Sequence, residues 1–125
     1  MVALPGSIGY GDGMNTAALA KKADVAGDLL KVLANPARLR ILCFLHEGER
    51  AVNEIEAHLG LRQSALSQQL AILRRERLVK TRRSAQFIYY SLSSDEARQI
   101  IDVLYAIYCA PRLKGDAKSK PSEFR

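Results

Sequence analysis

Residues 61–92, which read LRQSALSQQLAILRRERLVKTRRSAQFIYYSL, decide the fold that the sequence predicts. A polar start with small side chains is followed by Leu66, Leu70 and Leu73 at the spacing of one helix face. The segments at 79–83 and 87–90 then indicate the two strands of a hairpin. A helix followed by a basic hairpin is the layout of a winged helix, in which the helix enters a groove of DNA and the hairpin flanks it.

The positive charge of the chain is concentrated in this stretch. Residues 62–92 contain seven lysines and arginines and a single acid, Glu76, so they carry a net charge of +6. The whole chain of 125 residues also carries +6, so the charges outside the stretch cancel. An excess of basic charge confined to one segment is expected of a surface that binds phosphates.

The helix predicted at 63–75 has a second face of small and amide-bearing side chains. Away from the leucines and at helical spacing, this face carries Ser64, Ser67, Gln68 and Ala71. Glutamine pairs well with adenine, and serine can serve several bases. An ordinary solvated face would explain the same residues, but together with the charge and the hairpin they favour DNA contact. The residues predicted to bind DNA are Gln63, Ser64, Ser67, Gln68, Gln69, Lys80, Arg82, Arg83 and Gln86.

Length and composition narrow the class of protein. The chain is long enough for one domain with its own core but short for an enzyme with a substrate pocket. No apolar run approaches the roughly 20 residues that span a bilayer. Residues 1–6 lack the basic and apolar regions of a signal peptide. We therefore expect a cytoplasmic protein with no membrane partner, in a compartment where structural disulfides are uncommon.

The chain divides into three predicted parts. Residues 1–14 contain four glycines and predict a disordered arm, and residues 111–125 predict a basic, solvated tail. Between them, residues 15–110 predict a mainly α domain with a β-hairpin wing. Its helices are expected at 15–34, 36–46, 53–59, 63–75 and, after the hairpin, 95–109. The residues of the second helix that are expected to point inward are Leu39, Leu42, Cys43 and Leu45.

Two segments resemble the ArsR family of bacterial winged-helix repressors. They read LANPARLRIL at 33–42 and SALSQQLAIL at 64–73, and Leu78-Val79 follows them; the resemblance covers about residues 18–109. It implies a homodimer joined through the first and last helices, so that 15–110 would be a DNA-binding and dimerisation domain. It also implies that the dimer binds a near-palindromic operator in double-stranded DNA and that an inducer weakens this binding.

Three positions differ from the pattern of that family. Gln69 stands where many members have His, and Arg77 stands where many have Gly before Leu-Val. The hairpin turn has Ser84-Ala85 in place of the usual Gly.

The ligand sets with which ArsR-family members sense metals are missing from this sequence. Residues 52–57, on the predicted third helix, contain no thiol for a Cys-x-Cys site. The last helix has Asp95, Glu96 and Asp102 but no His. Four-coordinate zinc cannot be assembled from these residues. We therefore expect no metal site of either kind, and no cofactor.

The two cysteines of the chain are Cys43 and Cys109. A single free cysteine is most often a small core residue. As a pair, one on the second helix and one ending the last, they resemble the sulfide-responsive subgroup of the family, the BigR and SqrR repressors. That resemblance implies sensing thiols which reactive sulfur species, persulfide or polysulfide, convert to a polysulfide bridge, commonly a tetrasulfide, with release of DNA. It also implies control of sulfide-detoxification genes.

Other readings of the thiols stay open at this point. The protein would respond to peroxide if the cysteines closed a plain disulfide, which needs Cα atoms about 4.4–6.8 Å apart. It would respond to As(III) or Cu(I) if Cys43 and Cys109, with or without His46, bound a thiophilic metal. An enzyme using Cys43 and His46 is disfavoured, because no oxyanion donor or third group accompanies the pair. A winged helix that binds protein instead of DNA is the remaining alternative.

Overall fold

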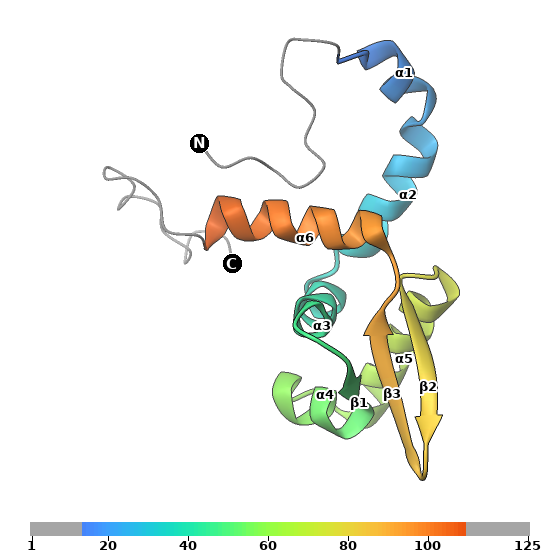
Figure 1. Ribbon diagram of the computed structural model, residues 1–125, viewed down its shortest axis with the longest axis vertical. Helices are drawn as coiled ribbons and strands as arrows, with labels where there is room; N and C mark the ends of the chain where they lie inside the picture. The colour runs from blue at the N-terminus through green and yellow to red at the C-terminus, as the bar shows by residue number, and fades with distance from the viewer. Residues whose placement is uncertain (1–13, 110–125) are drawn as a thin grey trace.

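The computed structural model describes residues 14–109, which form helices packed around a small sheet. In chain order the elements are α1 (Thr16–Lys21), α2 (Ala23–Leu33), α3 (Pro36–His46), β1 (Arg50–Ala51), α4 (Val52–Leu59), α5 (Gln63–Arg75), β2 (Val79–Ser84), β3 (Phe87–Leu92) and α6 (Asp95–Tyr108) (Figure 1). This order confirms the mainly α winged-helix fold that the sequence predicts. The predicted arm, apart from residue 14, and the predicted tail lie outside the described residues.

Local capping signals set the starts of two helices where they were expected. The Asn35 side chain accepts a hydrogen bond from the backbone N–H of Arg38 at 3.1 Å, and Pro36 is the first residue of α3. The Ser94 hydroxyl accepts from the backbone N–H of Ala97 at 3.0 Å at the start of α6. Both boundaries therefore follow from side chains next to the helix in sequence.

The prediction of one continuous N-terminal helix is wrong at Lys22. The Asn15 side chain caps α1 as expected, by accepting from the backbone N–H of Ala18 at 3.0 Å. At Lys22, however, the backbone leaves the helical conformation and its N–H turns to Leu19 and Ala20. No residue of α1 is buried, so no tertiary packing holds a straight continuation into α2.

The wing is a hairpin with a short third strand beside it. β2 and β3 pair antiparallel from Val79 opposite Leu92 to Ser84 opposite Phe87, and both strands extend slightly beyond their predicted ends. β1 pairs with the other edge of β3, which gives the strand order β1-β3-β2. β1 was not predicted, because two residues show no alternation of side chains. Figure 1 shows the hairpin projecting beyond the helices.

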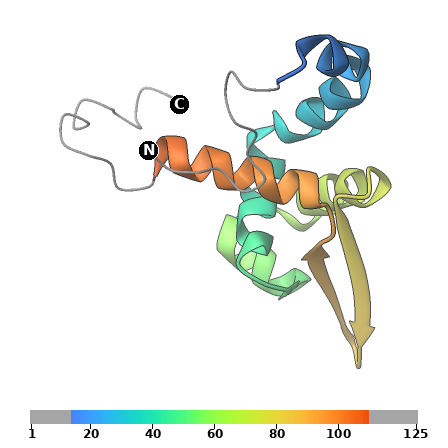
Figure 2. The ribbon, with the colours of Figure 1, turned by 45° about the horizontal axis from the view of Figure 1, so that its top comes forward.

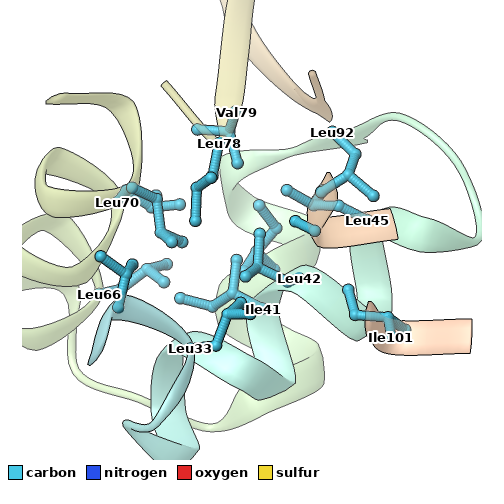
Figure 3. Packing of buried hydrophobic residues seen from close by; sticks show 14 residues of the cluster. Leu33, Ile41, Leu42, Leu45, Leu66, Leu70, Leu78, Val79, Leu92 and Ile101 are labelled. Atoms are coloured by element: carbon cyan, nitrogen blue, oxygen red, sulfur yellow. The ribbon is translucent and has the colours of Figure 1, made fainter. Parts of the chain in front are cut away.

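The core is one apolar cluster to which α2 to α6 and the wing strands contribute. The predicted leucine stripe of α5 is buried in it and meets residues of α3, among them Ile41 and Leu42 (Figure 3). Leu92 and Ile101 close the cluster from β3 and α6. α6 lies against α3, while α1 and the start of α2 extend away from the cluster (Figure 2). α5 is therefore held by one face and leaves the other accessible.

The end of α5 forms a Schellman motif around Arg77. The backbone N–H of Leu78 donates to the carbonyl of Leu73 at 2.9 Å, and that of Arg77 donates to the carbonyl of Arg74 at 3.0 Å. Arg77 has a φ of 65°, in the left-handed region that glycine usually occupies at this position of the motif. The arginine therefore adopts a strained backbone at the junction between α5 and the wing.

We expect Arg77→Gly to stabilise the protein by about 0.5–1 kcal/mol. The left-handed conformation costs a residue with a Cβ about 1–2 kcal/mol, and the extra freedom of glycine in the unfolded chain offsets part of that gain. Urea unfolding at fixed protein concentration measures the difference. Arg62→Gly, at an extended position before α5, is the matched control and should bring no gain. A loss of stability in Arg77→Gly would contradict the strain.

Candidate nucleic-acid interface and thiol pair

The accessible face of α5 carries most of the residues that the sequence predicts to contact bases. Gln63, Ser64, Ser67 and Gln68 are all exposed, while the leucine stripe on the other side is buried. No acidic residue lies in the first turn of the helix, so nothing there opposes the favourable interaction of its N-terminus with phosphate. The structure therefore brings these four side chains to one end and one side of a rigid helix.

A groove runs between this face of α5 and the wing. It has a volume of about 670 Å³ and is lined by Val52, Ser67, Leu70, Ala71, Arg74, Arg75, Ile88 and Tyr90. Both arginines are exposed, and they place positive charge beside the serine of the predicted base-contacting face. Their charge belongs to the basic excess of residues 62–92, but the sequence predicted no DNA contact for them. The missed signal was their position at the end of the helix, on the side that the hairpin faces.

The basic residues of the wing are divided between its two faces. Arg83 lies opposite Ile88 and Arg82 lies opposite Tyr89, and neighbouring residues of a strand point to opposite faces. Because Ile88 lines the groove, Arg83 shares the groove face. Arg82 and Lys80 belong to the other face, which we call the outer face of the wing. Gln86 is exposed in the two-residue turn at the end of the hairpin.

Arg82 is bound within the chain. Its Nε and Nη2 donate to the two carboxylate oxygens of Glu49, each at 2.8 Å. Its guanidinium lies over the ring of Tyr89, 4.6 Å from the ring centroid. The hydrogen bond from Arg82 lowers the pKa of the Glu49 carboxyl below its ordinary value, and the same bond raises the pKa of Arg82. From the sequence alone Arg82 is predicted to contact DNA, and nothing in the sequence reveals this partner.

Gln69 also has a partner inside the chain. Its side-chain oxygen accepts a hydrogen bond from Arg38 Nη1 at 3.0 Å, and Arg38 Nε donates to the carbonyl of Val32 at 2.8 Å. Arg38 thus joins the end of α2 to the middle of α5. Gln69 is half-buried on this inner side, whereas Gln68 is exposed. A contact between Gln69 and DNA stays a prediction.

We expect Arg38→Ala to destabilise the protein by about 1–2 kcal/mol. Hydrogen bonds from a charged donor contribute about 1.5–3 kcal/mol, and water replaces part of them because the site is only partly buried. Chemical denaturation measures the loss. Arg40→Ala, an exposed arginine of the same helix, should stay within about 0.5 kcal/mol. Equal effects of the two substitutions would contradict the role of the bridge.

The prediction that Cys43 points inward is wrong. Ile41, Leu42 and Leu45 form the buried stripe of α3, and Cys43 is exposed on another side of the helix. Leu39, which was also expected inside, is half-buried. Successive residues of a helix are about 100° apart, so a residue next to a buried leucine need not share its face.

Cys109 ends α6 and is exposed as well. The two thiols lie close enough for the charge of Cys109 to act on Cys43. The pKa of Cys43 is raised, first by the atoms that partly surround its sulfur, then by Cys109 and by Glu47. At neutral pH Cys43 is therefore mainly a thiol, and its reaction as a thiolate becomes faster as the pH rises.

The side chain of His46, three residues after Cys43, is paired with the last helix. Its Nε2 lies 2.8 Å from Asp102 Oδ1, which links the last turn of α3 to α6. In the part of the chain that the structure describes, no group of three or more His, Cys, Asp or Glu residues is arranged to hold a metal ion.

Within the residues that the structure describes, no helix has both the length and the apolar character that crossing a membrane requires.

Comparisons with known proteins agree with this geometry. The family model "Bacterial regulatory protein, arsR family" matches residues 35–81. The biofilm growth-associated repressor of Agrobacterium fabrum is 51% identical over 75% of this chain and 80% of its own. The transcriptional activator HlyU of Vibrio cholerae is 48% identical over 77% of this chain and 89% of its own. The crystal structure of the transcriptional repressor BigR from Xylella fastidiosa matches with a TM-score of 0.75 and 42% identity, covering 78% of this chain and 100% of that one.

These relatives are transcriptional regulators, which argues against the reading of Cys43 and His46 as a catalytic pair. The chain belongs to the arsR family of bacterial regulatory proteins and is a winged-helix transcriptional regulator.

Proposed function

We propose that the protein is a dimeric repressor that binds a near-palindromic operator and releases it when Cys43 and Cys109 are bridged through sulfur. The observation that carries this proposal is the position of the two thiols. They lie on α3 and at the end of α6, both exposed and close enough for the charge of one to raise the pKa of the other. Helix α3 packs against the DNA-facing helix α5, so a bridge at this point acts next to the output surface.

DNA binding rests on the exposed polar side of α5 and the arginines beside it. Gln68 and Ser67 are the side chains best placed for base edges, because they lie mid-helix on the accessible side. Arg74, Arg75 and Arg83 lie along or beside the groove that separates α5 from the wing. Arginines at this position suit the two DNA backbones that border a groove.

A second copy of the chain is the partner that fits the exposed apolar side chains. The exposed fraction of Val25 is 69% and that of Tyr105 is 58%, and Leu19, Leu30 and Ile107 are also exposed. They lie on α1, α2 and α6, the helices through which the family resemblance implies dimerisation. Large apolar side chains left exposed on helices are typical of an interaction surface. A dimer would place two copies of α5 about 34 Å apart, one turn of DNA.

Persulfide alone can supply both the sulfur atoms of the bridge and the oxidant that closes it. Each of the two thiols takes one sulfur atom from a low-molecular-weight persulfide and releases the corresponding thiol. A third persulfide then accepts two electrons and two protons and is reduced to a thiol and hydrogen sulfide. A bridge of four sulfur atoms remains between Cys43 and Cys109. Control of genes for sulfide detoxification would follow from an inducer of this kind.

Intact-protein mass spectrometry after persulfide treatment tests the sensing mechanism. The expected product has gained two sulfur atoms and lost two hydrogens, and it no longer binds the DNA duplex that the unaltered protein prefers. A product that has lost two hydrogens alone would indicate a disulfide and a peroxide response. A metal adduct after As(III) or Cu(I) would indicate the thiophilic-metal reading. An unchanged mass with unaffected DNA binding would rule out sensing by sulfur.

We expect Gln68→Ala to weaken binding to the preferred duplex by about 1–3 kcal/mol, with the loss confined to one base pair of each half-site. The duplex is first selected from a random library with the unaltered protein, and anisotropy titrations on single-base variants measure the effect. Gln99→Ala, an exposed glutamine on α6, is the matched control and should bind normally. A loss of equal size at every position would mean that Gln68 does not read a base.

A further inference from the structure

Three side chains form a continuous contact across the outer face of the wing, which we call the Glu49 strap. Arg82 on β2 reaches over the ring of Tyr89 on β3 and binds both carboxylate oxygens of Glu49, which immediately precedes β1. β3, which carries Tyr89, lies between β2 and β1 in the sheet (Figure 1). The contact therefore joins the two edges of the sheet by a route that does not pass through the core.

The strap holds its arginine in a defined geometry but does not bury it. The side chain of Arg82 is 56% exposed and that of Glu49 is 33% exposed. An exposed ion pair contributes little to stability, typically below about 1 kcal/mol, so structural support is a weak reason for this arrangement. What the pair does determine is the availability of a positive charge on the outer face of the wing, which the proposed function places along DNA.

A carboxylate offers an arginine the same paired oxygens as a phosphate does. Glu49 therefore occupies the position on Arg82 that a phosphate of the DNA backbone would take. Arg83, the next residue, faces the groove and has no such contact among those of the described chain. Of these two neighbouring arginines, one is presented to DNA and the other is engaged by an acid.

We propose that Glu49 acts as an internal substitute for phosphate that withholds Arg82 from DNA and so limits the protein's affinity for sequences other than its operator. Phosphate contacts carry no sequence information, so each one raises binding to all duplexes alike. Withholding one contact lowers the non-specific background and leaves base recognition by α5 unchanged. Glu49 is in this sense a specificity-determining residue. The proposal rests on the proposed function, because it takes the wing to lie along DNA.

The salt dependence of binding to a random-sequence duplex tests the proposal. Each phosphate contact adds about 0.9 to the slope of log affinity against log salt. Glu49→Gln keeps the shape of the side chain and removes its charge, so Arg82 is released. We expect the variant to bind the random duplex more tightly and to lose about 3.5-fold more affinity than the unaltered protein between 50 and 200 mM salt.

Three further variants make the outcome specific. Arg82→Ala alone should leave the slope unchanged, and Glu49→Gln with Arg82→Ala should return it to the unaltered value. Glu47→Gln removes the same charge from a neighbouring acid that pairs with Arg50, and it should not steepen the slope. The proposal is overturned if Glu49→Gln leaves the slope unchanged, if Glu47→Gln matches it, or if Arg82→Ala lowers the slope by about 0.9. Failure of the proposed function is a different result, in which the unaltered protein shows no salt-dependent binding at all.

Discussion

Replacement of either Cys43 or Cys109 by Ser should leave DNA binding unchanged and abolish its release by persulfide. Both thiols are exposed, so a hydroxyl of similar size disturbs no packing. With one sulfur missing no intramolecular bridge can form, and the protein should stay on the selected duplex at persulfide concentrations that release the unaltered protein completely. Anisotropy of a labelled duplex during titration with persulfide measures the release.

The two single variants and the double variant distinguish a bridge from modification of one thiol. If one cysteine alone carried the response, the other variant would still release DNA, and the two-thiol switch would be wrong. Because Cys109 raises the pKa of Cys43, Cys109→Ser should also increase the thiolate fraction of Cys43 at a given pH. Faster alkylation of Cys43 in that variant would show that the two groups interact in solution.

Leu73→Ala should destabilise the protein by about 2–5 kcal/mol, the largest stability effect that we expect from a single substitution. Leu73 is fully buried in the core cluster on the inner side of α5, where its loss leaves a cavity that the surrounding elements can fill only in part. Because α5 carries the residues proposed to contact bases, DNA binding should fall together with the folded fraction. Urea unfolding at fixed protein concentration measures the loss, since the stability of the proposed dimer would depend on concentration.

The matched control removes a larger apolar side chain from an exposed place. Phe87→Ala, near the end of the wing, should cost less than about 1 kcal/mol because this side chain is 42% exposed. If the two substitutions destabilised the protein equally, α5 would not be held by the leucine stripe.

The elements that could be predicted from the sequence are those with local signals. The Asn35-Pro36 pair marks the start of α3, and the leucine spacing together with the basic hairpin identifies α5 and the wing. The bounds predicted for both helices agree with the structure. The exposed side of α5 also follows from periodicity, since fixing the buried stripe fixes the opposite face.

The features that could not be predicted depend on residues far apart in the chain. Arg38 and Gln69 are 31 residues apart, and Glu49 and Arg82 are 33 apart. In each pair the sequence alone indicates a charged or amide side chain that faces solvent, because its partner comes close only in the folded chain. The orientation of Cys43 was missed for a different reason, because the composition of α3 is apolar on several sides and does not define which side faces the core. The helix accordingly has a weak amphipathic pattern.

Helix α3 connects three places that have been described separately. Near its first turn Arg38 binds Gln69 of α5, Cys43 lies in its second half, and His46 at its last turn meets Asp102 of α6. From Arg38 to His46 the axis measures about 12 Å, a length over which a helix is effectively a rigid rod. α3 is therefore linked to α5 near its start and to α6 near its end. A tilt of α3 imposed at Cys43 would be transmitted to Gln69 without a change of conformation in any residue between them.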